Sequence, residues 1–187
     1  MAIAVEPRET VTIPVELLSS PDAQAFPPGI RYELIDGVLL VSPGASLFHQ
    51  RVVGNLLVIL RECRPPGHEA LVAPFDWYVD EWTYFEPDLV VVRTGDVSAR
   101  RYEAAPLLVV EVLSPSSRLR DVGMKLDAYS RAGLQSYWVV DPDEPSLTAF
   151  RSIDGRLVEE SKVSGDSKFV SHDPVQSTVV PSELIRP

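Results

Sequence analysis

Hydrophobic and polar positions along the chain change between the two-residue period of strands and the longer period of helices. Apolar runs at residues 32–35 and 38–41 flank Asp36-Gly37, a dipeptide that favours a two-residue type I′ turn. This pattern predicts a β-hairpin. From His49 to Cys63 the apolar residues recur at helical spacing, and Pro65-Pro66-Gly67 follows. That segment predicts a helix packed on a sheet.

The rest of the chain contains more strand patterns than helix patterns. Strands rich in Val, Leu and aromatic residues are predicted at about residues 70–79, 88–92, 107–113, 135–140 and 178–180. A second helix is expected over residues 118–132, with Gly133 as its C-terminal cap. A second hairpin, with arms at residues 147–151 and 156–160, is predicted across Asp154-Gly155.

The order of these elements is strands, helix, strands, helix, strands. It predicts a mixed β-sheet core flanked by helices, with additional β-hairpins: an α/β protein of the mixed α+β kind. The connection from residues 107–113 through the second helix to residues 135–140 is typical of a parallel crossover. At 187 residues we expect one domain spanning residues 1–187. Residues 1–12 are predicted to form a mobile arm, followed by a short helix around residues 14–19.

Composition narrows the class of protein. The hydrophobic fraction of 45% is typical of a globular chain, and no apolar run approaches the ~20 residues of a membrane span. A start without a secretory signal and a single cysteine, Cys63, favour a cytoplasmic location. The net charge of -10 argues against broad coating of nucleic acid. A local basic cleft stays possible, because four cations lie close together in the sequence: Arg118, Arg120, Lys125 and Arg131.

Two acidic residues lie where strands are predicted to be buried. Glu111 interrupts the apolar run 107–113, and Asp88 follows Pro87 at the start of the run 88–92. A buried carboxylate must be neutralised by a metal, a cation or a proton. On adjacent strands, Asp88 and Glu111 would form an oxygen-ligand site suited to Mg²⁺ or Mn²⁺. Without metal, burial and repulsion from Asp88 should raise the pKa of Glu111. The alternatives are a satisfied salt bridge for Glu111 and a simple boundary position for Asp88.

Further polar candidates lie on the predicted helices. Asp121 and Lys125 share one helix face at i,i+4 spacing. Lys125 either leans over the strand ends or forms an exposed ion pair with Asp121. His49 and Gln50 open the first helix, where backbone amides favour anions, so they are candidates for contacting a phosphate. The alternative for His49 is a capping role. Arg118 and Asp121 are two more candidate substrate contacts.

Several of these residues occur together in one order. In sequence they are Tyr-Glu-Leu-Ile-Asp-Gly at 32–37, His49-Gln50, Pro87-Asp88, Glu-Val-Leu-Ser-Pro-Ser at 111–116, Asp121 to Lys125, Tyr129, and Gly133 followed by Tyr-Trp-Val-Val-Asp at 137–141. Over about residues 30–155 the chain resembles the Uma-two family of bacterial putative restriction endonucleases, which is placed in the PD-(D/E)XK nuclease superfamily. The resemblance implies a four-stranded mixed core sheet, a divalent metal and hydrolysis of nucleic-acid phosphodiesters.

The same resemblance implies roles for individual residues. Asp88 and Glu111 match the metal-binding acids, and the Val112 carbonyl matches a backbone metal ligand. Lys125 matches a catalytic lysine displaced onto the helix, and Glu33 matches an additional acid of the site. The superfamily pattern has a lysine two residues after the acid, where this chain has Leu113.

These features predict an endonuclease that requires Mg²⁺ or Mn²⁺ and acts on nucleic acid, with DNA as the expected partner. A homodimer is expected as well, because restriction-type nucleases often need two sites for two strands. Two alternatives remain open: a non-catalytic binding or regulatory module on the same fold, and a hydrolase of a small phosphate ester.

Overall fold

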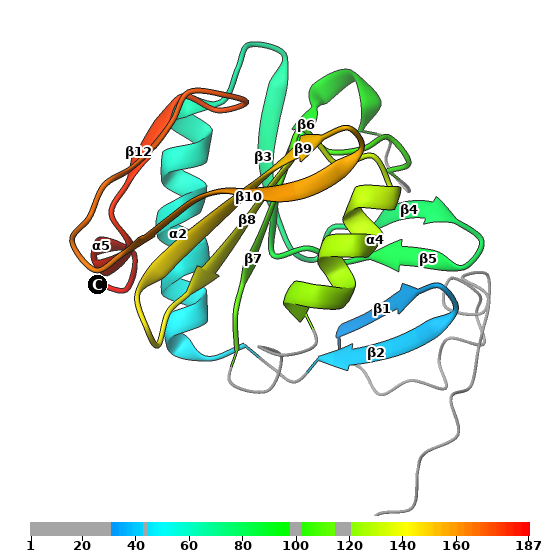
Figure 1. Cartoon of the computed structure of the whole chain (residues 1–187), viewed down its shortest axis with the longest axis horizontal. Helices are drawn as coiled ribbons and strands as arrows, with labels where there is room; N and C mark the ends of the chain where they lie inside the picture. The colour runs from blue at the N-terminus through cyan, green and yellow to red at the C-terminus, as the bar shows by residue number, and fades with distance from the viewer. Residues whose placement is uncertain (1–30, 43–44, 98–101, 115–120) are drawn as a thin grey trace, which may run out of the picture.

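A mixed six-stranded sheet forms the centre of the protein (Figure 1). The computed structural model describes residues 31–42, 45–97, 102–114 and 121–187. The sheet comprises, in spatial order, β10 (Arg156–Ser164), β9 (Ser146–Ile153), β8 (Ser136–Asp141), β7 (Leu108–Val112), β6 (Leu89–Arg93) and β3 (His68–Val72). β7 and β8 pair in parallel, as predicted, and the other neighbours pair antiparallel. The sheet has two strands more than the four-stranded core that the resemblance implies. The predicted arm 1–12 and helix 14–19 lie outside the described residues.

The first long helix, α2 (Leu47–Cys63), confirms the prediction from helical spacing. It begins two residues earlier than expected, because the Ser46 side chain accepts a hydrogen bond from the His49 amide at 3.1 Å and caps the first turn. Val52, Leu56 and Leu60 are fully buried and pack against apolar residues on one face of the sheet.

The second helix differs from its prediction. In place of one regular helix over residues 118–132, a π-helical turn η3 (Asp121–Lys125) leads into α4 (Leu126–Arg131), and residues 118–120 lie outside the described chain. The predicted cap is confirmed: Gly133 has a φ of 80°, and the Leu134 amide donates to the Tyr129 carbonyl at 3.0 Å. α4 lies on the face of the sheet opposite α2 (Figure 1).

A second sheet has four antiparallel strands in the order β2-β1-β5-β4. They are β1 (Arg31–Ile35), β2 (Val38–Ser42), β4 (Trp77–Asp80) and β5 (Thr83–Phe85). The hairpin β1-β2 is confirmed, with φ angles of 51° at Asp36 and 78° at Gly37. The single strand predicted at 70–79 is wrong. β3 ends at Val72 in the six-stranded sheet and β4 begins in the other, because Pro74 lies between them and has no amide to continue a ladder.

Two apolar clusters cover the two faces of the central sheet. The cluster under α2 is mainly aliphatic, whereas the cluster between the sheet and α4 is rich in aromatic rings. In the second cluster Tyr129 contacts Phe85 with ring centroids 4.5 Å apart and stacks on Trp77 at 5.8 Å. The second sheet therefore docks on the central one through aromatic packing around α4.

The C-terminal part adds peripheral elements. The β9-β10 hairpin across Asp154-Gly155 is confirmed. The strand expected near residues 178–180 is β12 (Ser177–Val179), which pairs with β11 (Phe169–Ser171). A short helix, α5 (Pro181–Leu184), follows and packs beside α2. None of the helices in the described ranges is long and apolar enough to cross a membrane.

Candidate active site

Asp88 and Glu111 meet across the β6-β7 pair. The antiparallel register aligns Leu89 with Val110 and Val90 with Val109, so continuing it by one residue places Asp88 opposite Glu111. Val90 and Val109 belong to the aromatic cluster. Because side chains alternate along a strand, the two acids project toward that same face. Both are buried, at 3% and 6% exposure, and the condition for a shared site is met, because Asp88 directly precedes β6 and Glu111 lies on the neighbouring β7.

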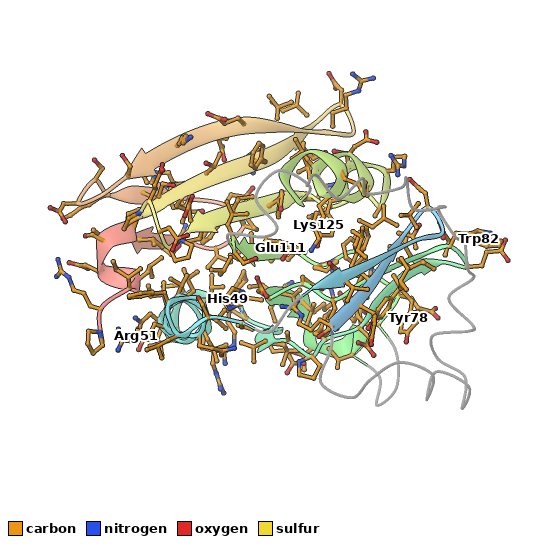
Figure 2. All side chains as sticks on the ribbon, turned by 90° about the horizontal axis from the view of Figure 1, so that it is seen from below. His49, Arg51, Tyr78, Trp82, Glu111 and Lys125 are labelled. Carbon is orange, nitrogen blue, oxygen red and sulfur yellow. The ribbon has the colours of Figure 1, made fainter. Side chains whose placement is uncertain are left out.

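Glu111 is held by a cation and a phenol. Lys125 Nζ lies 2.8 Å from Glu111 Oε1, and the Tyr129 hydroxyl donates to the same oxygen at 2.7 Å. Lys125 Nζ also lies 2.7 Å from Glu33 Oε2, and Glu33 Oε1 accepts from the Glu86 amide at 3.1 Å. At 3% exposure Lys125 is not part of a surface ion pair, so that alternative is wrong. Figure 2 shows Glu111 between Lys125 and His49.

The electrostatics of this group follow from burial. Burial raises the pKa of Glu111 to about 8 even though Lys125 opposes it, and the charges of Asp88 and Glu33 raise this pKa further. This confirms the direction predicted from the sequence. Burial would lower the pKa of Lys125, but Glu111 and Glu33 outweigh it and raise that pKa well above its ordinary value. Lys125 therefore stays protonated.

Asp88 has a different set of partners. Arg31 Nη1 lies 2.6 Å from Asp88 Oδ1, while His49 Nε2 and the Val112 amide lie 3.1 Å and 2.8 Å from Asp88 Oδ2. Burial alone would raise the pKa of Asp88, but the hydrogen bond with His49 and the charge of Arg31 lower it to about 2. Asp88 is therefore an anion at neutral pH.

A pocket of about 430 Å³ opens beside Asp88. It lies between the first turn of α2 and the start of β1, and its polar lining consists of Arg31, His49, Gln50, Glu86 and Asp88. The His49 side chain is buried with Nδ1 unpartnered among the described residues, while Gln50 is exposed. Because Ser46 caps α2, the alternative that His49 is the cap is wrong.

The basic cluster predicted at residues 118–131 is not an exposed patch where the structure describes it. Lys125 is buried, and Arg131 pairs with Asp36 at 2.6 Å and with Asp127. Arg118 lies outside the described residues, and so does the side chain of Asp121.

Sequence reasoning missed Arg31 and Glu86 and gave Tyr129 no role beyond its place in the motif order that carries the resemblance. The alternation of side chains along β1 contains a signal for Arg31. Arg31, Glu33 and Ile35 share one face, and Ile35 belongs to the aromatic cluster. The charged residues of that face therefore had to find partners in the interior. For Tyr129 the signal is its hydroxyl, because a buried phenol usually has a hydrogen-bond partner.

The donor set fits a divalent ion of the Mg²⁺ type. Among the described residues no group of three or more His, Cys, Asp or Glu side chains could hold a metal by itself. Mg²⁺, however, is usually bound through one or two carboxylates and keeps several waters or phosphate oxygens. Asp88 and Glu111 would offer two such carboxylates, which here pair with Arg31 at 2.6 Å and with Lys125 at 2.8 Å.

Comparison with known proteins supports one family. The Uma2 family model, described as "Putative restriction endonuclease", matches residues 14–180. A search of curated proteins gives no significant match. Among solved structures, the chain is similar to a "putative nuclease belonging to DUF820" from Anabaena variabilis ATCC 29413, with a TM-score of 0.68 and 16% identity. That similarity covers 87% of this chain and 94% of the other, and at this identity it shows a shared fold.

Proposed function

Because the chain belongs to the Uma2 family, we propose that it is a metal-dependent endonuclease that hydrolyses nucleic-acid phosphodiester bonds, with DNA as substrate and Mg²⁺ or Mn²⁺ as cofactor. The observation that carries this proposal is the cross-strand pair of Asp88 and Glu111 with a buried lysine 2.8 Å from Glu111. Two acids and a lysine are the side chains that the superfamily pattern requires, and here they come from the residue before β6, from β7 and from η3.

Each residue has a distinct task in this proposal. Asp88 and Glu111 would hold the ion, which when bound supplies Lewis-acid polarisation of a phosphate and a more acidic water. Lys125 keeps its proton, orients Glu111 and provides positive charge where the attacked phosphate becomes more negative. Glu33 is the second carboxylate that holds Lys125. His49, Gln50 and Arg31 border the adjacent pocket, where a phosphate of the substrate would lie.

Leu113 explains why the lysine must come from another element. Glu111 and Leu113 point to the same side of β7, so a lysine at position 113 would enter the site directly. Leu113 instead packs against the aromatic cluster. The lysine beside Glu111 is Lys125, at the end of the π-helical turn.

The test is a cleavage assay on DNA and RNA with Mg²⁺, Mn²⁺ or EDTA. We expect cleavage only with a divalent ion, and none by Asp88→Asn or Glu111→Gln. Lys125→Ala should slow cleavage roughly a few hundred-fold, which corresponds to a loss of about 3–4 kcal/mol of transition-state stabilisation. Lys125→Ala combined with Leu113→Lys should recover part of the activity. The exposed Arg131→Ala serves as the control and should cleave normally.

Cleavage that persists in Lys125→Ala would exclude the role proposed for this lysine. Cleavage that is insensitive to EDTA would exclude the metal. The variants are compared at a temperature at which circular dichroism shows each of them to be folded, so that lost stability is not mistaken for lost catalysis.

A second candidate function is a non-catalytic binding or regulatory module. It is favoured by the complete pairing of the site, because Asp88 and Glu111 each already have a protein cation within 2.8 Å. The net charge of -10 points the same way. Nucleic-acid binding in gel-shift assays, without cleavage under any metal condition, would favour this module over the nuclease.

A third candidate, a hydrolase of a small phosphate ester, is favoured by the pocket beside Asp88. Its volume of about 430 Å³ is typical of small-molecule sites. Hydrolysis of p-nitrophenyl phosphate esters in preference to DNA would support this candidate.

A further inference from the structure

Arg31 and the buried carboxylate of Asp88 are neighbours in the lining of the pocket. Its guanidinium makes three contacts: Nη1 with Asp88 Oδ1 at 2.6 Å, Nη2 with the Glu86 carbonyl, and Nε with Glu86 Oε1 at 3.3 Å. The Arg31 side chain is 28% exposed, whereas that of Asp88 is 3% exposed. Arg31 is thus the solvent-side neighbour of an acid that is otherwise enclosed.

The contacts of Asp88 leave one oxygen for any further ligand. Each carboxylate oxygen has two lone pairs, and Oδ2 already has two partners, His49 Nε2 and the Val112 amide. Oδ1 has Arg31 as its partner and therefore retains one lone pair. A divalent cation on Oδ1 would lie next to the guanidinium, and two positive charges so close together inside a protein repel each other strongly.

The geometry allows Arg31 to leave Asp88 without leaving the site. Only the Nη1 contact involves Asp88. The other two are the Nη2 hydrogen bond to the Glu86 carbonyl and the ion pair with the Glu86 carboxylate, in which Nε forms no hydrogen bond among the described residues. The same side chain lines the pocket of about 430 Å³, which provides room for a small rotation. Asp88 also keeps His49 and the Val112 amide when Nη1 withdraws, so its remaining charge is not left without donors.

We propose that Arg31 is an exchangeable counter-ion of Asp88, which neutralises this carboxylate in the metal-free protein and withdraws toward the pocket when a divalent cation binds. The inference rests on the proposed function in one respect, that Asp88 is a metal ligand. It assigns Arg31 a positioning role that neither the acids nor Lys125 can fill. Arg31 then stabilises the metal-free protein and at the same time lowers its affinity for metal.

This exchange has a measurable consequence. When only the fraction of molecules with Arg31 withdrawn can bind metal, the apparent affinity is reduced by that fraction. If the withdrawn state is populated to about 10%, which is ordinary for a minor conformer, removing the guanidinium should tighten binding about tenfold. The metal-free protein should at the same time melt at a lower temperature, because a buried carboxylate loses its charged partner.

The experiment titrates Mn²⁺ into the full chain by isothermal calorimetry and follows the melting temperature with and without Mn²⁺. Arg31→Gln should bind Mn²⁺ about tenfold more tightly than the wild type and melt lower without metal. Arg31→Lys keeps the charge but cannot bridge Asp88 and Glu86 as a planar fork, so its affinity should be intermediate. Arg131→Gln is the matched control, because Arg131 also pairs with two carboxylates but is more exposed than Arg31. This variant should bind Mn²⁺ as tightly as the wild type does.

Two results would overturn the exchange. The first is that Arg31→Gln binds Mn²⁺ with wild-type affinity. The second is that Arg31→Gln binds Mn²⁺ more tightly while Arg31→Lys keeps wild-type affinity, which would show a general effect of charge. Should Arg31→Gln fail to fold, Arg31→Lys decides: tighter Mn²⁺ binding than in the wild type supports the exchange, and wild-type affinity overturns it. Asp88→Asn separates the two proposals: if it abolishes Mn²⁺ binding while Arg31→Gln leaves affinity unchanged, only the exchange fails. If no variant and no wild-type protein binds Mn²⁺, the metal-dependent function fails.

Discussion

The buried polar cluster has two halves that differ in their surroundings. In the closed half, Glu111 contacts Lys125 and Tyr129 within the aromatic packing between the sheet and α4. In the open half, Asp88 contacts Arg31 and His49 beside the pocket. Both carboxylates are almost completely buried, yet the pKa of Glu111 rises to about 8 and that of Asp88 falls to about 2.

The donors that surround each carboxylate, and not its depth of burial, explain why the two pKa values shift in opposite directions. Asp88 interacts with a guanidinium, an imidazole and a backbone amide, and all of them favour the charged form of the carboxylate. Among the described residues Glu111 contacts one cation, Lys125, which it shares with Glu33, and it faces the negative charge of Asp88 as well. Burial thus sets the cost of a charge in this cluster, whereas the number of donors per carboxylate decides which acid stays ionised.

The largest expected effect tests the closed half. Lys125→Met leaves Glu111 and Glu33 buried without their cation, so the free energy of unfolding at pH 7 should fall by about 3–5 kcal/mol. Urea denaturation followed by fluorescence measures this change. The exposed Arg131→Met should change it by less than about 1 kcal/mol. Equal losses in the two variants would show that Lys125 is not enclosed as described.

A smaller effect concerns the pH dependence of Glu111. Its pKa is raised in the folded protein, so its contribution to stability is complete below its unfolded value of 4.5 and is lost as the pH rises through about 8. Relative to the wild type, metal-free Glu111→Gln should gain stability between pH 5 and pH 8, by on the order of 3 kcal/mol. Urea denaturation at several pH values measures the gain. A large, pH-independent loss in this variant would instead indicate a purely structural salt bridge.

The hydroxyl of Tyr129 should contribute less than the lysine. Tyr129→Phe keeps the aromatic packing and removes one hydrogen bond to Glu111, so we expect a loss of about 1.5–3 kcal/mol. Thermal denaturation measures the change. The matched control is Tyr84→Phe, which removes a hydroxyl contact with Asp76 in a less buried setting and should cost less. A neutral Tyr129→Phe would show that Lys125 alone holds Glu111.

The smallest expected effect is the loss of stability at acid pH that comes from Asp88 in the open half. The pKa of Asp88 is lowered, so its contribution is present above its unfolded value of 3.8 and is lost as the pH falls toward about 2. The lost contribution should be about 1–2 kcal/mol. Acid unfolding curves of the wild type and Asp88→Asn measure it, and the wild type should have the steeper curve below pH 4. Identical slopes would mean that Arg31 and His49 do not favour the ionised form.

Local patterns were sufficient for the two hairpins, the first long helix and the two acids. The hairpin turns at Asp36-Gly37 and Asp154-Gly155 depend on neighbouring residues, which the sequence displays directly. Glu111 and Asp88 were recognisable because each interrupts or begins an apolar run. The break between β3 and β4 was missed, because apolar residues continue on both sides of Pro74 and only the partner strands show that they belong to different sheets.

The mixed fold and the candidate site residues Asp88, Glu111 and Lys125 therefore follow from the chain's local patterns and from its resemblance to a known family. Which cation pairs with each acid depends on contacts between distant segments. Arg31 reaches Asp88 across 57 positions of sequence, and Lys125 reaches Glu33 from a π-helical turn. Such pairs depend on how the second sheet docks on the first. Periodicity describes the face on which a side chain lies, but it carries no information about which distant face packs against it.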